Sequence, residues 1–411
     1  MSLESKSSPD PYIALKYPSF RLFIAFKFFI TVALQVESVL AGWQIYDFTH
    51  DALSLGLMGL AEVIPNISVT LFGGHLADRI NRKYIMLTCL VVLFVDAVGL
   101  SFFSRQLGVP YLYASIAVTG LCRGFIGPAS FGLMSETVPR EHYVNSSAWS
   151  SSLWQIAAML GAGSAGFLLH LLGYSHCYDL SALLIFIATF AIFLIKYDFK
   201  PPTNKRDSVF VSIKEGLAFV WADGRIVGAM GLDMLAVLFG GATALLPIFA
   251  NEILKVGPEG LGLLRAAPSL GALLMAIFLT RFPPVKKSGK KLFISVAVFG
   301  LCMIGFAIST NFYLSLVFLF ISGAIDNVSV VIRSTIMQTL TPHHMKGRVS
   351  SVNSIFISSS NEIGAFESGV AAKVMGTIPS VVFGGMMTLV VVIMMYFLLP
   401  KLKELEFKDA L

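Results

Sequence analysis

The sequence predicts an all-α integral membrane protein with twelve transmembrane helices arranged in two six-helix bundles. The 411 residues are 56% hydrophobic and only 13% charged, whereas ordinary soluble domains carry about 25% charged residues. Apolar runs recur along the whole chain, and many reach the roughly 20 helical residues needed to cross a hydrocarbon core of about 30 Å. The two halves of the chain also resemble each other at a fixed offset.

Each of the twelve expected helices corresponds to one of these runs. Little polar sequence remains outside them, so we expect no soluble catalytic domain. The polar segment before Phe20 is followed by an apolar run too long for a signal peptide, so the first span is retained. The expected spans are residues 19–46, 53–77, 84–104, 111–133, 147–172, 177–196, 226–252, 257–280, 291–309, 312–336, 348–375 and 379–399.

The distribution of basic residues predicts the orientation. Nearly all Lys and Arg residues fall on the side that carries both termini, and the other side keeps only Arg105, Lys255 and Lys373. Because basic loops stay in the cytoplasm, we expect a multi-pass protein of the plasma membrane with both termini cytoplasmic. The net charge of +6 then indicates contact with membrane lipids rather than a nucleic-acid partner.

A polar linker divides the chain into three parts. We expect an N-terminal six-helix bundle at 1–196, a cytoplasmic linker at 197–225, and a C-terminal six-helix bundle with a cytoplasmic tail at 226–411. Within the linker, 212–225 has apolar residues at helical spacing, which predicts an amphipathic helix at the membrane surface or an ordinary connecting helix.

An internal repeat relates the two bundles. At an offset of 203 residues, Gly59 and Pro65 align with Gly262 and Pro268, and Gly120 aligns with Gly323. Parallel repeats of this kind are one architecture of secondary transporters, with the substrate site at the repeat interface near the middle of the membrane.

The repeat reverses the charge of two residue pairs inside the spans. Glu62 aligns with Arg265, and Arg123 aligns with Asp326. Ionisable groups at membrane depth are costly and often functional. We interpret these four residues as two charge-complementary sites; the alternative is that they form salt bridges that only hold helices together.

The loop between the second and third spans contains a recognisable motif. It reads Gly73-Gly74-His75-Leu76-Ala77-Asp78-Arg79-Ile80-Asn81-Arg82-Lys83. This resembles the cytoplasmic loop signature of the major facilitator superfamily. By that resemblance, Gly74, Asp78, Arg79, Arg82 and Lys83 form a cytoplasmic gate. Asn81 stands where the signature has Gly, and Asn tolerates the left-handed turn expected there.

Two further features resemble the same superfamily. Arg123, followed by Gly124, resembles a fourth-span arginine associated with proton coupling in proton-coupled members. The fifth span lacks the Gly-Pro pair of the antiporter signature. The wider sequence from Trp43 to Lys83 resembles a bacterial exporter branch that includes enterobactin-type siderophore exporters and macrolide efflux proteins. This resemblance implies that the membrane is the bacterial inner membrane.

Seven ionisable residues are candidates for coupling or substrate binding. By the resemblance, spans one, four, seven and ten line a central cavity, which favours Glu37, Arg123, Asp233 and Asp326. Glu62 and Glu362 compete with Glu37 and Asp326 for the proton-carrying role, and Arg265 completes the set: Glu37, Glu62, Arg123, Asp233, Arg265, Asp326 and Glu362. The histidines and cysteines lack the spacing of metal ligands, so we expect no metal site.

These observations predict a secondary active transporter and not an enzyme. No catalytic motif and no nucleotide-binding loop occurs in the sequence, so we expect no catalytic residues and no cofactor. The predicted function is export of an amphipathic small molecule, a siderophore or a drug-like compound, by alternating access in exchange for protons. The expected protein is a monomer. Alternatives are a translocator of lysophospholipid or another lipid and, in a different class, a transport-dead receptor or scaffold.

Overall fold

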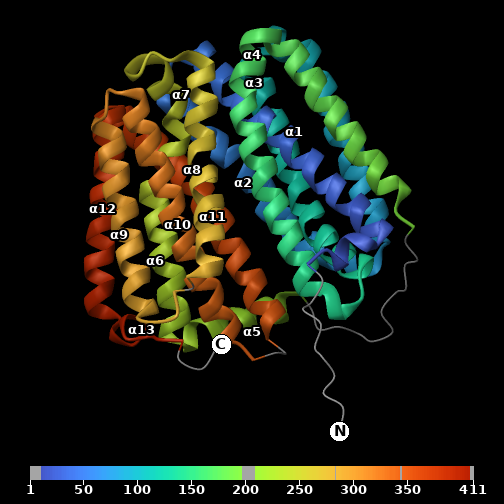
Figure 1. The fold of residues 1–411 in the computed structure, drawn as a ribbon. Coiled ribbons are helices and arrows are strands. Elements are labelled where there is room, and N and C mark those ends of the chain that lie inside the picture. Colours follow the sequence, from blue (N-terminus) through green and yellow to red (C-terminus); the bar gives the residue numbers. More distant parts are fainter. Residues whose placement is uncertain (1–10, 197–208, 283, 343–344, 408–411) are drawn as a thin grey trace.

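The structure is a computed structural model that describes residues 11–196, 209–282, 284–342 and 345–407. Every regular element among these residues is a helix. The residues up to Leu194 form one group of helices, and the residues from Val209 onward form a second group beside it (Figure 1). The chain is therefore all-α, as the composition predicts.

The first group consists of four long helices. After a short 3-10 turn at Ile13–Lys16 come α1 (Pro18–Thr49), α2 (Ala52–Arg79), α3 (Arg82–Thr137) and α4 (Tyr143–Leu194), the last two separated by a second turn at Arg140–His142. Each of α3 and α4 covers two expected spans. Gly108 and Gly173 interrupt them at φ 65° and 73°, a backbone conformation that glycine adopts without a steric penalty. These four helices therefore supply six spans.

The second group begins with α5 (Val209–Ala222) and α6 (Gly224–Gly240). The expected span 226–252 is not one regular helix, because after Gly240 it continues as a 3-10 turn (Ala242–Leu245), α7 (Leu246–Ile248) and a π turn (Phe249–Ile253). The remaining helices are α8 (Gly257–Arg281), α9 (Ser288–Ile308), α10 (Phe312–Leu340), α11 (Lys346–Met375), α12 (Thr377–Leu398) and the short α13 (Pro400–Lys403).

The observed helices are consistent with twelve crossings. Among the described residues, nine helices are long and apolar enough to span a membrane; α3 and α4 each supply two crossings. The serine-rich α11 is absent from those nine although it has 30 residues, because its polar side chains lower its hydropathy. The linker prediction is only partly within the described residues, since 197–208 lie outside them. Its amphipathic segment is helical as α5, which ends at Ala222, and Asp223 caps α6.

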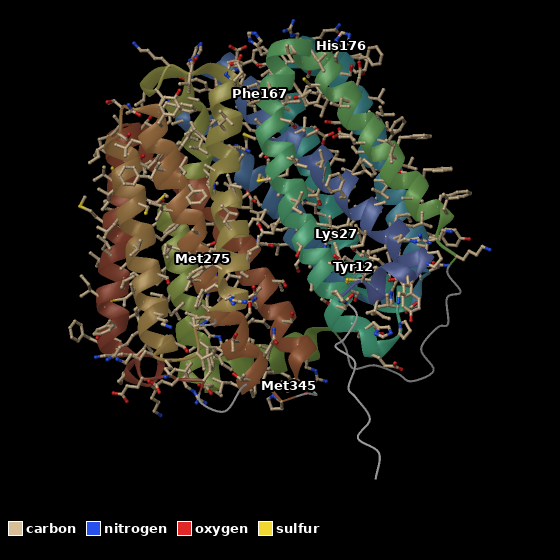
Figure 2. The ribbon with its side chains drawn as sticks, in the orientation of Figure 1. Tyr12, Lys27, Phe167, His176, Met275 and Met345 are labelled. Carbon is tan, nitrogen blue, oxygen red and sulfur yellow. The ribbon has the colours of Figure 1, made fainter. Side chains whose placement is uncertain are left out.

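The two groups meet tightly at one end of the molecule, which we call the distal end: here α1 ends at Thr49 and α11 ends at Met375. Figure 2 shows His176 at this end and Met345 at the opposite, proximal end. A buried apolar cluster at the distal end draws on both groups, with Val39 and Tyr46 from the first and Phe249 and Phe306 from the second. The proximal ends of the groups have separate cores.

Glycines allow helices of the two groups to approach closely. A Cβ atom added to Gly59 of α2 would lie 2.5 Å from the backbone oxygen of Glu362 in α11, and one added to Gly262 of α8 would lie 2.9 Å from the backbone oxygen of Gly163 in α4. Gly59 and Gly262 are the pair that the 203-residue repeat aligns. Both interfaces between the two groups therefore have a glycine at the position that the repeat aligns.

Candidate functional site

A cavity of about 570 Å³ lies between the two groups of helices. Its lining comes from α1, α2, α3 and α4 on one side and from α6, α8, α10 and α11 on the other. Apolar side chains such as Leu55, Met58, Trp154 and Phe299 form much of the wall. This volume lies within the range of about 300–1,000 Å³ found for small-molecule sites.

Six of the seven candidate residues line this cavity: Glu37, Glu62, Arg123, Arg265, Asp326 and Glu362. The seventh, Asp233, lines a small crevice of about 10 Å³ that Asp326 also lines. Asp326 therefore connects the cavity to the crevice. The fold brings together residues that are up to 325 positions apart in the sequence.

Arg123 and Glu62 form an ion pair that joins α3 to α2. The pair depends on a close approach of the two helices, because a Cβ atom added to Gly120 would lie 2.2 Å from the backbone oxygen of Glu62. Gly120 is one turn before Arg123, so the glycine brings the arginine next to its partner. The pair joins two of the four charged residues that the repeat singles out.

The other two of these four residues, Arg265 and Asp326, do not pair with each other. Arg265 instead extends across the cavity to α1, where its Nη1 donates to the Ser38 hydroxyl at 3.1 Å. The buried ion pair of the second group joins Arg333 to Asp233 at 2.5 Å, linking α10 to α6. Arg333 lies two turns beyond Asp326 on the same helix, so the buried ion pair of the second group does not use the residues that the repeat aligns with Glu62 and Arg123.

Arg333 is a candidate residue that the seven predicted positions omit. Its side chain is 9% exposed, and its Nε also donates to the Ser329 hydroxyl at 3.3 Å. The signal that could have identified it is its position inside a span that already contains Asp326, since ionisable residues inside a membrane tend to pair.

Glu37 is the most deeply buried of the cavity carboxyl groups. The residue is 8% exposed, and its Oε1 has no hydrogen-bond partner. It lies on α1 one residue before Ser38, so the Arg265 contact and the unpartnered carboxyl oxygen share one part of the wall. Polar groups of both signs therefore meet in the middle of the cavity.

Three polar contacts connect the two groups of helices at the distal end. Tyr46 of α1 donates to Glu252, Lys373 of α11 pairs with Asp51 before α2, and His170 of α4 lies 2.9 Å from Glu259 of α8. The hydrogen bond from Lys373 lowers the pKa of the Asp51 carboxyl. We call these three contacts the distal gate. Sequence patterns did not single them out, although the 203-residue offset aligns His170 with Lys373.

A comparison with protein-family models decides the family. The Major Facilitator Superfamily model matches residues 22–365, which is most of the chain and includes both groups of helices. This chain belongs to the major facilitator superfamily. It is accordingly a multi-pass membrane transporter, not an enzyme.

Curated relatives of this major facilitator protein include exporters. The chain is 25% identical to the enterobactin exporter EntS of Escherichia coli O1:K1 over 394 residues, covering 94% of this chain and 93% of the relative. It is 26% identical to the enterobactin exporter of Shigella boydii serotype 18 over the same length. The resemblance to this exporter branch therefore extends over nearly the whole chain.

Solved structures of major facilitator type share the fold. A POT family transporter crystallised with 5-aminolevulinic acid has a TM-score of 0.75 at 14% identity and covers 93% of this chain and 96% of its own. A bacterial homologue of the human lysosomal transporter Spinster, in an inward-facing and unoccupied conformation, has a TM-score of 0.69 at 12% identity, covering 94% and 97%.

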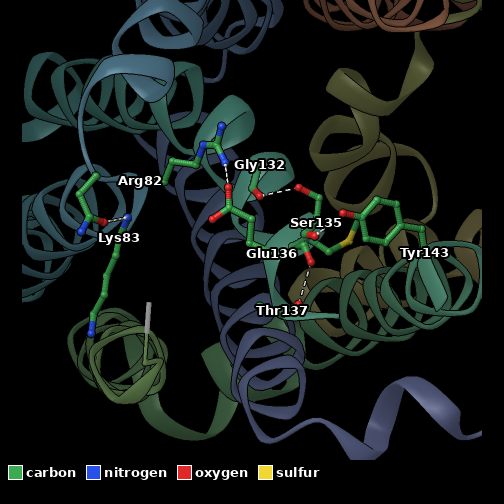
Figure 3. Close-up of polar contacts among 9 residues, drawn as sticks. Arg82, Lys83, Gly132, Ser135, Glu136, Thr137 and Tyr143 are labelled. Atoms are coloured by element: carbon green, nitrogen blue, oxygen red, sulfur yellow. Dashed lines mark hydrogen bonds and ion pairs between the residues drawn. The ribbon is translucent and has the colours of Figure 1, made fainter. Parts of the chain in front are cut away.

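The superfamily loop signature covers the end of α2 and the start of α3. Arg82 pairs with Glu136 near the end of α3 and passes over Gly132, where a Cβ atom would lie 2.5 Å from its Nε (Figure 3). Lys83 donates to the backbone oxygens of Phe193 and Ile195, each at 2.7 Å. Both basic residues therefore tie the start of α3 to neighbouring helix ends.

The rest of the signature is only partly described. The backbone at Gly74, Asp78 and Arg79 is helical in α2, but the positions of their side chains lie outside the described part of the structure. Asn81 does not adopt the left-handed conformation that the sequence suggested. Its φ is −57°, and its side chain instead caps α3 by accepting from the Lys83 backbone N–H at 3.0 Å. Asn is among the residues preferred at an N-cap, since its side-chain oxygen can accept such a bond.

Proposed function

We propose that this protein exports an amphipathic small molecule from the bacterial cytoplasm by alternating access, in exchange for protons. The observation that carries the proposal is the cavity of about 570 Å³, which has an apolar wall, six ionisable side chains and a lining drawn from both halves of the repeat. A site at the repeat interface changes the side to which it opens when the halves rock against each other.

In this proposal, the proximal end faces the cytoplasm and the distal end faces outward. The distal gate and the buried cluster around Tyr46 and Phe249 close the outward side. The basic loops at the proximal end fit a cytoplasmic position with both termini inside. Residues 1–196 and 226–411 would then move as the two rocking bundles, with 197–225 as the connection between them.

Outward opening requires the distal gate contacts to separate. Each of them joins one half to the other, so rocking about the middle of the membrane breaks all three at once. The close glycine contacts of α2 with α11 and of α4 with α8 must also open on that side. Substrate binding can shift the equilibrium between the inward-open and outward-open states only if the substrate binds one state more tightly than the other.

The carboxyl groups of the cavity are suited to carry the exchanged protons. Glu62 is held by Arg123, whereas Glu37, Asp326 and Glu362 line the cavity without an ion-pair partner among the described residues. An unpaired carboxyl group at membrane depth can become neutral by binding a proton, so its charge changes as the cavity is exposed to either side.

Reconstituted protein tests the proposal. Liposomes that contain the purified protein and are acidic inside should accumulate enterobactin or a macrolide from a neutral medium, while liposomes without protein should not. Collapsing the pH gradient with a protonophore should stop the accumulation. Uptake at an unchanged rate after the collapse would reject proton exchange, and uptake of lysophospholipid alone would replace the proposed substrate with a lipid.

A further inference from the structure

Arg265 is the one cavity arginine that has no carboxylate partner in the described part of the chain. No carboxylate oxygen lies within 4.0 Å of its guanidinium, and the contact that it makes is the hydrogen bond from Nη1 to the Ser38 hydroxyl at 3.1 Å. Its Nε is buried without a partner. A guanidinium has five N–H donors, so most of its capacity is unused.

Two other arginines, Arg123 and Arg333, lie well inside the spans, and both are paired. Arg123 binds Glu62, and Arg333 binds Asp233 at 2.5 Å. Of these three arginines, Arg265 is the one that lacks a carboxylate partner among the described residues. A charge left without a partner where water is partly excluded is costly, and Arg265 lines the cavity.

The unpaired carboxyl groups of the cavity do not need a counter-ion in the way that Arg265 does. Glu37, Asp326 and Glu362 can lose their charge by taking up a proton. A guanidinium keeps its charge under all conditions that a protein meets. An anion from outside the chain is therefore the group that completes the site at Arg265.

The surroundings of Arg265 have room for such a group. Arg265 and Ser38 both line the cavity of about 570 Å³. Gly42 of α1 lies beside the guanidinium, where even an added Cβ atom would be in ordinary van der Waals contact, 3.4 Å from Nη2. The Ser38 hydroxyl accepts from Arg265 and can donate its own hydrogen to the same anion. Met58, Trp154 and Phe299 line the same cavity and provide an apolar surface for the rest of the ligand.

We infer that the cavity binds an amphipathic anion whose acidic group pairs with the guanidinium of Arg265 and with Ser38. This inference deepens the proposed function, because it gives the transported molecule a charge. The acidic group could belong to a soluble carboxylate or catecholate or to the phosphate of a lysophospholipid. All of these present oxygen acceptors that a guanidinium binds with two parallel N–H donors. An inside-negative membrane potential would also favour the export of an anion.

Binding to purified protein without any gradient tests the inference. Three probes share a naphthalene body and differ in head group: 2-naphthoate, 2-naphthalenesulfonate and 2-naphthyltrimethylammonium. Equilibrium dialysis in detergent should show that both anions bind at least about tenfold more tightly than the cation, the ratio expected for a single charge-assisted contact. Equal binding of all three probes, or tighter binding of the cation, would overturn the inference.

Variants test whether the preference for anionic probes depends on Arg265. R265Q should remove the preference for anions, R265K should retain part of it, and S38A should weaken anion binding without reversing the preference. R281Q is the matched control, because Arg281 lies on the same helix at its exposed end. Monodispersity on size exclusion confirms that each variant is folded; if R265Q fails this check, R265K and S38A carry the test. An unchanged anion preference in the folded variants overturns the inference.

Competition separates the two sources of the acidic group. Displacement of 2-naphthoate by lauroyl-lysophosphatidate indicates a lipid ligand, and displacement by 2,3-dihydroxybenzoate alone indicates a soluble one. Because none of these measurements needs transport, they are independent of the proposed function. If the protein binds anions through Arg265 but shows no proton-driven flux, the result rejects proton exchange and leaves the anion site intact.

Discussion

At the scale of single residues, the cavity is defined by which charges are paired. Glu62 has Arg123, Asp233 has Arg333, and Arg265 has only the Ser38 hydroxyl. Because ionisable side chains are costly inside a membrane, each of these arrangements must either stabilise the fold or serve transport. Substitutions distinguish the two roles.

Neutralising Glu62 should reduce both stability and transport. E62Q leaves the Arg123 guanidinium without its counter-ion, and the loss of this partly exposed pair should lower stability by about 1–3 kcal/mol. The melting temperature in detergent and proton-driven flux in liposomes measure the two effects. The double variant E62Q/R123Q should recover most of the stability and none of the transport. Full transport in E62Q and in D326N would contradict a proton role for these carboxyl groups.

Gly120 should be intolerant of a side chain. In G120A the new Cβ atom would lie 2.2 Å from the Glu62 backbone oxygen, so α2 and α3 must separate and the Arg123 pair must weaken. We expect a large drop in melting temperature and in yield of folded protein. G127A is the matched control on the same helix, because nothing lies within 4 Å of a Cβ atom there. Similar melting of the two variants would show that α2 and α3 tolerate separation.

At the scale of helices, two contacts of the distal gate connect α4 to α8 and the start of α2 to α11. Two of its contacts place a basic residue at positions aligned by the repeat, His170 on α4 and Lys373 on α11. Both lie about one turn from close glycine contacts, Gly166 against Pro258 and Gly369 against Gly56. Each interface thus combines close backbone packing with a polar contact at its end.

Reversing one charge of the gate should favour the outward-open state. D51K places two ammonium groups together and should raise the population in which the distal ends are apart, while D51K/K373D should restore the closed state. Spin labels at His176 and Thr310, on opposite halves of the distal end, would report the separation after the four buried cysteines are replaced. An identical distance distribution in D51K and the unmodified protein would show that this pair does not hold the gate.

The pH dependence of this pair has a definite sign. The pKa of Asp51 is lowered, mainly by the hydrogen bond from Lys373. A lowered pKa in the folded state means that the contribution is fully present above the ordinary aspartate value of about 3.9 and is lost as pH falls through the lower, folded value. The contact between Asp51 and Lys373 should therefore persist from pH 8 to pH 5, so the spin-label distance should not change over this range. In D51N the distal ends should be separated to the same extent at every pH in the range. Opening that depends on Asp51 within that range would contradict the assignment.

At the scale of the whole molecule, both ends of the chain should lie on the cytoplasmic side. The prediction rests on the excess of basic residues in the proximal loops. Epitope tags on both termini should be digested by protease in inverted membrane vesicles and protected in right-side-out vesicles. Protection of one tag and digestion of the other would require an odd number of crossings and would reject the twelve-span topology.

The sequence by itself determined the class and outline of this protein. Length and hydropathy placed its helices, because twenty apolar residues are enough to cross a bilayer wherever they occur in the chain. The repeat pointed to Glu62, Arg123, Arg265 and Asp326, since ionisable residues inside apolar runs are visible without a structure. Six of the seven candidate residues then proved to line one cavity.

Only the tertiary structure decided which of these residues meet. The repeat pointed to four charged residues but did not say which of them pair. In the structure Arg265 contacts Ser38 on α1, and Arg333 pairs with Asp233 on α6. The distal gate likewise joins residues that are 89 to 322 positions apart, such as His170 with Glu259 and Asp51 with Lys373. Hydropathy is a local property of a segment, whereas an ion pair depends on the rotation and separation of two packed helices. That geometry is set by packing across the whole molecule.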